Sequence, residues 1–193
     1  MGNRSFFAAV ALLGAAQALP VSTVHAQDQK HQTQCAQTVA LFKQTDPGMD
    51  KYFKSSVGYA IFPSVGKGAF VVGGAAGTGC LYQGGAIIGE AKLAQVTIGL
   101  QLGGQSYAEV IFFQNDDVIA AFKRNSFEMS AQVSAVAAAS GASANAKYRL
   151  GVLVFTVAKG GLMYEASVGG QKFTFKPLAT DTASAPGAEK PKD

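Results

Sequence analysis

The fold of this chain is decided by the stretch Val57–Tyr82, VGYAIFPSVGKGAFVVGGAAGTGCLY, in which short apolar runs alternate with glycine. Val, Ile, Phe and Tyr favour strands, and paired glycines allow the positive φ angles of tight hairpin turns. Glycine inside a helix costs roughly 1 kcal/mol relative to alanine, so the glycine content argues against helices. We therefore predict an antiparallel meander of three short strands, at 57–62 before Pro63, at 68–72 before Gly73-Gly74, and at 78–82.

Length and composition are those of one globular domain with appendages. The chain has 193 residues, of which 48% are hydrophobic and only 15% are charged, and its formal net charge is +4. This apolar content is ample for a core. The 16 basic residues are scattered and form no basic arm, so we exclude nucleic-acid binding.

The first 26 residues have the pattern of an export signal. Arg4 supplies a basic start, Phe6–Leu19 is apolar, and Val24-His25-Ala26 is a cleavage site before Gln27. The apolar run of about 14 residues is shorter than the ~20 that a membrane-spanning helix needs. We predict that residues 1–26 are a cleaved signal peptide and that the protein is exported to the periplasm. The alternative is that this segment is not cleaved and anchors the protein in the membrane.

The only two cysteines, Cys35 and Cys80, both follow the predicted signal. An oxidising compartment permits a disulfide between them. Such a bond would join the N-terminal helix to the meander across about 45 residues, which the chain-entropy model values at about 4 kcal/mol. Two alternatives remain open, a disulfide and a pair of buried thiols.

The segment 28–56 is predicted to be helical. Cys35, Val39 and Phe42 recur at helical spacing and form one apolar face. Asp46-Pro47 then has the pattern of an N-cap followed by proline at the first helical position, which starts a second, short helix.

The segment 57–178 is predicted to be rich in β-structure. The consecutive apolar residues Val110–Phe113 suit a sheet that is buried on both faces. Asn115 is expected to cap one short internal helix, with acidic residues in its first turn and basic residues at its end. Further strands are expected at 94–103, 106–114, 127–139, 145–158, 162–168 and 172–176.

The domain organisation follows from these segments. The domain covers 28–178, and the tail 179–193, rich in Ala, Pro and charge, is predicted to be disordered. The fold class is α+β: N-terminal helices packed on an extensive, mostly antiparallel, partly closed β-sheet with one short internal helix.

Catalytic and metal-binding patterns are weak in this chain. His25 is removed with the signal, and His31 is far in sequence from the predicted sheet. Gly104–Ala108 has no histidine partner for a nucleophile elbow, and Gly66-Lys67-Gly68 lacks the remaining residues of a phosphate-binding loop. Two cysteines without a histidine cluster do not make a zinc site. We predict a non-enzymatic protein without a cofactor or a metal.

Five blocks in order give the chain a resemblance to a known family. They are GYAIFPSVGKGAFVVGGAAGTGCLY (58–82), TIGLQLGGQSYAEVIFF (97–113), the helix with Phe122, SAQVSAVAAASG (130–141) and VFTVAKGGLMYEASVGGQKF (154–173). The chain resembles the SYLF domain, whose eukaryotic members bind phosphoinositides and in part actin. The resemblance implies binding to lipid or to a membrane surface, whereas an exported protein is not expected to meet actin.

Lipid binding of this kind requires cations beside apolar groups, because anionic headgroups attract each nearby Lys or Arg by about 1 kcal/mol. We expect Lys67 and Lys159 at one end of the sheet, since each precedes a glycine-rich strand. The alternative is that these lysines only solvate the rim of the fold. The candidates are Lys51, Lys54, Lys67, Lys147, Arg149 and Lys159, with Tyr52, Phe53 and Tyr148 as interfacial aromatics and Lys51, Lys54 and Lys67 preferred.

The predicted function is therefore non-enzymatic binding to anionic phospholipid or a membrane surface in the bacterial cell envelope. One alternative is a structural envelope protein that binds another protein through a sheet edge. A small integral outer-membrane β-barrel is a further alternative, but the Pro- and Lys-containing tail differs from the aromatic-terminated strand of such proteins.

Overall fold

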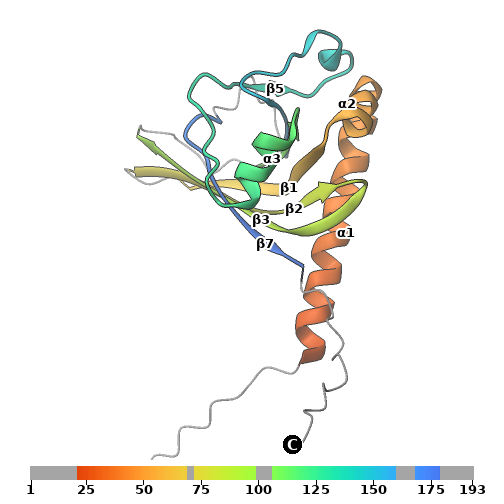
Figure 1. The fold of residues 1–193 in the computed structure, drawn as a ribbon, viewed down its shortest axis with the longest axis vertical. Helices are drawn as coiled ribbons and strands as arrows, with labels where there is room; N and C mark the ends of the chain where they lie inside the picture. The colour runs from red at the N-terminus through yellow and green to blue at the C-terminus, as the bar shows by residue number, and fades with distance from the viewer. Residues whose placement is uncertain (1–20, 69–71, 99–105, 160–167, 179–193) are drawn as a thin grey trace, which may run out of the picture.

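The structure, a computed structural model, describes residues 21–68, 72–98, 106–159 and 168–178 (Figure 1). Seven strands form one sheet in the order β5-β6-β4-β1-β2-β3-β7, and all neighbouring pairs are antiparallel except β5 and β6. This confirms the predicted α+β class. The helices are α1 (Val21–Thr45), the 3₁₀ turn η1 (Pro47–Met49), α2 (Asp50–Ser55), α3 (Asp116–Lys123) and the 3₁₀ turn η2 (Ala142–Asn145); the strands are β1 (Gly58–Gly68), β2 (Val72–Gln83), β3 (Ala86–Ile98), β4 (Ser106–Phe113), β5 (Ala135–Ala137), β6 (Val152–Lys159) and β7 (Lys172–Pro177).

The meander differs from the predicted three short strands. Its described residues form two long strands, β1 and β2, because Pro63 does not end the first one, while 69–71 of the predicted strand 68–72 lie outside the described residues. The register of β1 shifts around Pro63 against both β2 and β4. Such a bulge accommodates a residue that lacks an N–H group. Gly73-Gly74 likewise lies inside the β2 ladder rather than in a turn.

The C-terminal half contains less strand than predicted. Of the stretch 127–139 only β5 is a strand, and of 145–158 only β6, with η2 between them. Residues 134–144 are almost all Ala and Ser, which offer a sheet little side-chain surface to pack. β3 starts at Ala86, earlier than the predicted residue 94, while 99–103, the run 162–167 and the tail 179–193 lie outside the described residues.

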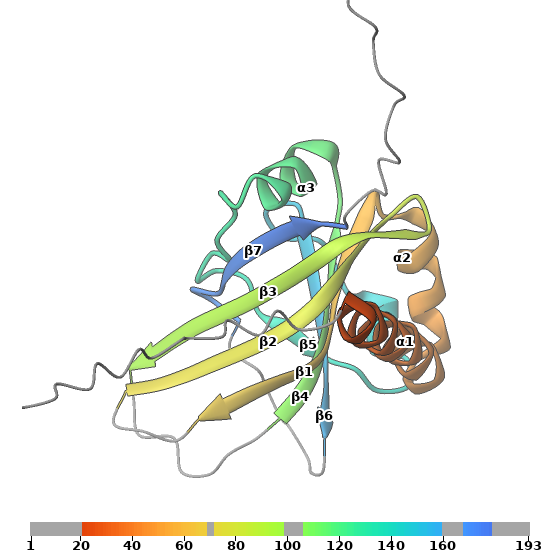
Figure 2. The same cartoon turned by 90° about the horizontal axis from the view of Figure 1, so that it is seen from below.

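The sheet is buried on both faces, as the run Val110–Phe113 predicted. Val110 and Phe112 pack with residues of α1 and α2, and Ile111 and Phe113 pack with residues of α3. Figure 2 shows α1 and α2 on one side of the strands and α3 on the other. The core is therefore two apolar layers that share one sheet.

The sheet is open, with β5 and β7 at its edges. One stretch of chain reaches both edges: the N–H of Met129 donates to the carbonyl of Gln171 beside β7 (2.8 Å), and the same stretch then forms β5 (Ala135–Ala137) beside β6. Within the described residues the two edge strands do not pair with each other, so the sheet is unclosed and the expected partial closure is wrong.

The N-terminal segment is helical as predicted, with Asp46 at the N-cap of η1, where its side chain accepts a hydrogen bond from the N–H of Gly48 (3.0 Å). α1 begins at Val21 and so includes the residues around the predicted cleavage site. A disulfide joins Cys35 of α1 to Cys80 of β2, with Cα atoms 6.2 Å apart. Among the described helices, none combines the length and the apolarity that crossing a membrane requires.

Candidate membrane-contact surface

The predicted cations lie at two opposite ends of the sheet. β1 and β6 both run antiparallel to β4, so they share one direction. Lys51 and Lys54 precede β1, and Lys147 and Arg149 precede β6, which places these four at the starting ends of the two strands.

Lys67 and Lys159 lie at the finishing ends, since Gly66 pairs with Ser106 and Ser106 pairs with Lys159. At about 3.3 Å per strand residue, the two ends are on the order of 20 Å apart. The three preferred lysines, Lys51, Lys54 and Lys67, therefore do not lie on one surface.

The two aromatic residues of α2 are packing residues. The hydroxyl of Tyr52 donates to the carbonyls of Ser143 (3.0 Å) and Ala146 (2.8 Å), and its ring is buried. Phe53 packs edge-to-face on Phe112, with ring centroids 4.8 Å apart. The Tyr52 ring is buried and the Phe53 ring is half-buried, so both contribute to packing, and their role at a membrane interface stays a prediction.

The cations of α2 are partly neutralised. Asp50 forms ion pairs with Lys54 and with Lys43 (2.9 Å). Hydrogen bonds from these two lysines, Lys54 foremost, lower the pKa of the Asp50 carboxyl. Lys51 lies over the Tyr52 ring, 4.8 Å from its centroid. Both lysines are exposed, but of the two only Lys54 forms an ion pair within the described ranges.

The segment 141–149 is attached to the helical layer at two points. Besides the Tyr52 hydroxyl, the buried carboxylate of Asp46 accepts a hydrogen bond from the N–H of Ser143 (2.7 Å). Burial by itself would raise the pKa of Asp46, but the hydrogen bonds donated by Ser143, Gly48 and Gly141 outweigh it and lower the pKa. These contacts hold the segment rigidly at the end of the molecule where α2 lies (Figure 1).

The segment ends in a two-residue hairpin turn, Leu150-Gly151. Arg149 and Val152 exchange both backbone hydrogen bonds (2.8 and 3.0 Å), and φ is +50° at Leu150 and +79° at Gly151. Turns with two positive φ angles favour Asn-Gly, whereas a leucine in this left-handed region is strained by roughly 1–2 kcal/mol. The side chain of Leu150 is nevertheless 63% exposed, the highest value among the described large apolar residues.

Cations and apolar surface surround this turn. Lys147 and Arg149 are exposed, and within the described ranges no ion pair involves either of them. Tyr148 between them is half-buried and packs edge-on against Tyr52. A groove of about 260 Å³ borders the two cations and is lined by apolar residues such as Val133, Ala135, Val136 and Val154.

Leu150 is the functional candidate that sequence reasoning missed. The predicted strand 145–158 placed it inside a long strand, where an apolar side chain is unremarkable. The local signal was the pair Leu150-Gly151 directly after Arg149, which is a turn pattern with leucine in the position that usually carries Asn or Asp.

Two carboxylates oppose the positive charge of the turn. Asp116 and Asp117 open α3, and the N–H of Gln114 just before this helix donates to the carbonyl of Gly151 (2.9 Å). The surface is therefore positive on the side of Lys147 and Arg149 and negative on the side of α3.

A second polar group of note is buried inside the sheet. Gln171 donates from Nε2 to Oε2 of Glu109 in β4 (3.0 Å), and both residues are fully buried. The pKa of nearby Tyr107 is raised, first by burial and then by the Glu109 charge. The sequence analysis missed this pair because Glu109 sits in an apolar strand and its partner is 62 residues away.

Comparisons with known proteins agree with this description. A family model, Ysc84, described as a Las17-binding protein actin regulator, matches residues 94–182. Beta cell expansion factor A of Aeromonas veronii is 27% identical over 92 residues, which are 48% of this chain and 35% of that protein. The aligned region is thus about a third of that relative. The match contains β4, α3 and the Leu150 turn, and over residues 94–182 this chain is similar to the Ysc84 (SYLF) family.

Proposed function

We propose that this protein is a non-enzymatic binder of membrane surfaces in the bacterial cell envelope, and that it contacts anionic lipid through the Leu150 turn. Similarity to the SYLF family supports a binding role of the lipid or actin type rather than catalysis. The observation that carries the proposal is Leu150 itself, an exposed leucine in a backbone conformation that other residues adopt more easily.

The chemistry of the turn suits a bilayer interface. Full burial of a leucine side chain is worth about 1.5–3 kcal/mol, and each cation near an anionic surface adds about 1 kcal/mol. Leu150 would enter the region between headgroups and acyl chains, while Lys147 and Arg149 would remain at the level of the phosphates. The predicted export signal would place this contact in the periplasm.

The test is co-sedimentation of the purified protein with vesicles of phosphatidylglycerol and phosphatidylcholine, and with vesicles of phosphatidylcholine alone, each at two salt concentrations. We expect stronger binding to the anionic vesicles, weakened by salt because exposed charges are screened. Leu150→Asn should weaken this binding about tenfold or more, which corresponds to the lost apolar burial.

Leu150→Asn also separates binding from folding, since asparagine tolerates the left-handed conformation and should keep or increase stability. Leu41→Asn is the matched control, because Leu41 is also exposed (37%) but lies on α1. Equal binding by wild type and Leu150→Asn would refute the proposal. Binding that did not depend on lipid charge or on salt would favour a protein over anionic lipid as the partner that the family resemblance implies.

A further inference from the structure

Three potential metal ligands meet between α1 and the sheet, away from the Leu150 turn. His31 and Cys35 are one helical turn apart on α1, and Nε2 of His31 lies 3.9 Å from Sγ of Cys35. Cys80 of β2 completes the group, in which all three ligand atoms are within 4.8 Å of one another. The sequence predicted no zinc site because two cysteines lacked a histidine cluster, whereas the tertiary structure brings His31 beside both of them.

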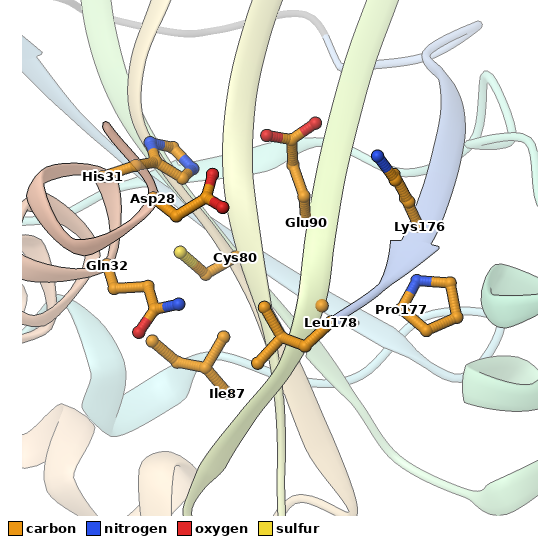
Figure 3. A pocket seen from close by; sticks show the side chains of 10 residues that line it. Asp28, His31, Gln32, Cys80, Ile87, Glu90, Lys176, Pro177 and Leu178 are labelled. Atoms are coloured by element: carbon orange, nitrogen blue, oxygen red, sulfur yellow. The ribbon is translucent and has the colours of Figure 1, made fainter. Parts of the chain in front are cut away.

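The group borders a cavity of about 230 Å³, which His31, Cys80 and Asp28 help to line (Figure 3). Figure 3 shows the carboxylate of Asp28 beside the His31 ring, and Glu90, the cross-strand partner of Cys80, on the neighbouring strand. Both cysteines are buried, and the cavity reaches Cys80 and His31.

We propose that, when the disulfide is reduced, Cys35, Cys80 and His31 bind one thiophilic metal ion, with Zn²⁺ as the test ion. Two thiolates and one imidazole are a donor set that zinc favours, and the fourth position would face the cavity and Asp28. Zinc bonds of about 2.3 Å to sulfur and 2.0 Å to nitrogen separate tetrahedral ligands by roughly 3.5–3.8 Å. Nε2 of His31 and Sγ of Cys35, 3.9 Å apart, are already close to this separation, whereas the two sulfur atoms must move apart once the disulfide is reduced.

The disulfide and the metal are alternative links between the same two elements. A dithiol donates two electrons and two protons to the Cys35–Cys80 bond, becomes a disulfide itself, and leaves two thiols. Zn²⁺ then displaces the two thiol protons and bonds to both sulfur atoms and to the unprotonated imidazole nitrogen. The link between α1 and β2 would therefore be retained in both redox states.

The test is titration of the purified protein with Co²⁺, a coloured substitute for Zn²⁺, after reduction by a phosphine, which is oxidised to phosphine oxide with oxygen from water. We expect one ion per chain with a thiolate-to-cobalt charge-transfer band, displacement by Zn²⁺, and no band in the oxidised protein. Zn²⁺ should raise the melting temperature of the reduced protein only, because binding to the folded state stabilises it.

His31→Ala should weaken binding to the reduced protein at least tenfold, whereas Gln34→Ala, an exposed change next to Cys35, should leave it unchanged. An unchanged affinity of His31→Ala, or the absence of a charge-transfer band in folded reduced protein, would overturn the proposal. If reduction alone abolishes the far-ultraviolet circular dichroism of the fold, Zn²⁺ should restore it, and failure to restore it would also overturn the proposal.

Discussion

Two hairpin turns of this protein share a backbone conformation and differ in side chain. Between β2 and β3 the turn is Gly84-Gly85, with φ of +61° and +82°, and before β6 it is Leu150-Gly151, with φ of +50° and +79°. Glycine adopts these angles without strain, whereas leucine does not. The first turn is explained by the hairpin alone, and the second requires a reason for its leucine.

The surroundings of the two turns supply that reason. Beside the glycine turn, Lys123 donates to Oε1 of Gln83 (3.1 Å) and is occupied within the fold. The leucine turn follows two exposed cations and a segment attached to Asp46 and Tyr52. One turn only reverses the chain, and the other presents an apolar side chain on a rigid, charged support.

The largest expected effect comes from removing that support. Asp46→Ala leaves the N–H groups of Ser143 and Gly48 without their charged acceptor, and such hydrogen bonds contribute about 1.5–3 kcal/mol each. We expect urea unfolding to show a loss of about 2–3 kcal/mol, and hydrogen exchange to accelerate in 141–152 but not around Gly84. Asp46→Asn, which keeps an acceptor oxygen, should lose less; equal acceleration at both turns would contradict the comparison.

Low pH should weaken the same attachment of the segment 141–149 to Asp46. Because the pKa of Asp46 is lower in the folded protein than the ordinary 3.8, its contribution to stability is complete above the unfolded pKa. The contribution is lost as the pH falls through the lower, folded pKa. The free energy of unfolding of Asp46→Asn, measured against pH, should fall less steeply on the acid side than that of wild type. If the curves of wild type and Asp46→Asn fell in parallel, protonation of Asp46 would not account for the loss of stability in acid.

The next largest effect is expected when the positive charges beside the leucine turn are removed. Lys147→Gln with Arg149→Gln should weaken binding to anionic vesicles by about 2 kcal/mol, or roughly thirtyfold, and should flatten its salt dependence. Lys123→Gln, beside the glycine turn, is the matched control and should change binding little. A larger effect of Lys123→Gln would move the contact surface to the other turn.

Exchange of the turn residues tests the backbone argument directly. Leu150→Gly should relieve the left-handed strain and Gly84→Leu should introduce it, so thermal unfolding should shift in opposite directions by roughly 1 kcal/mol each. Gly84→Leu has open space for the new side chain, so a loss there reports strain rather than collision. If Gly84→Leu stabilised the protein, leucine would not be strained in this conformation, and the argument from Leu150 would fail.

The smallest expected effect is an increase in binding. Asp116→Asn with Asp117→Asn removes negative charge next to the leucine turn and should strengthen binding to anionic vesicles a fewfold at low salt. The same change weakens the favourable interaction with the α3 dipole by about 0.3–1 kcal/mol per charge. Vesicle binding that falls in proportion to stability would show that the two carboxylates act only through the fold.

Local chemistry explains what the sequence predicted well. Asp46 and Asn115 cap helices because their side chains reach N–H groups two or three residues on. Gly84-Gly85 turns the chain because glycine tolerates positive φ, and Val110–Phe113 is apolar on both sides because both faces of β4 are covered. These features depend on neighbours in sequence, and with the ordered blocks they were sufficient for the α+β class and for the similarity to the SYLF family.

Tertiary structure decided the features that depend on distant partners. From its low strand propensity, Pro63 was predicted to end a strand. In the structure it lies in a bulge within β1, which pairs with β2 on one side and β4 on the other. Leu150 fitted a strand pattern until hydrogen bonds between Arg149 and Val152 made it a turn. His31 and Cys80 are 49 positions apart in number, and only the packing of α1 on β2 brings them together. Periodicity reports which faces of an element are apolar, whereas the position of a side chain relative to the rest of the chain is set by packing.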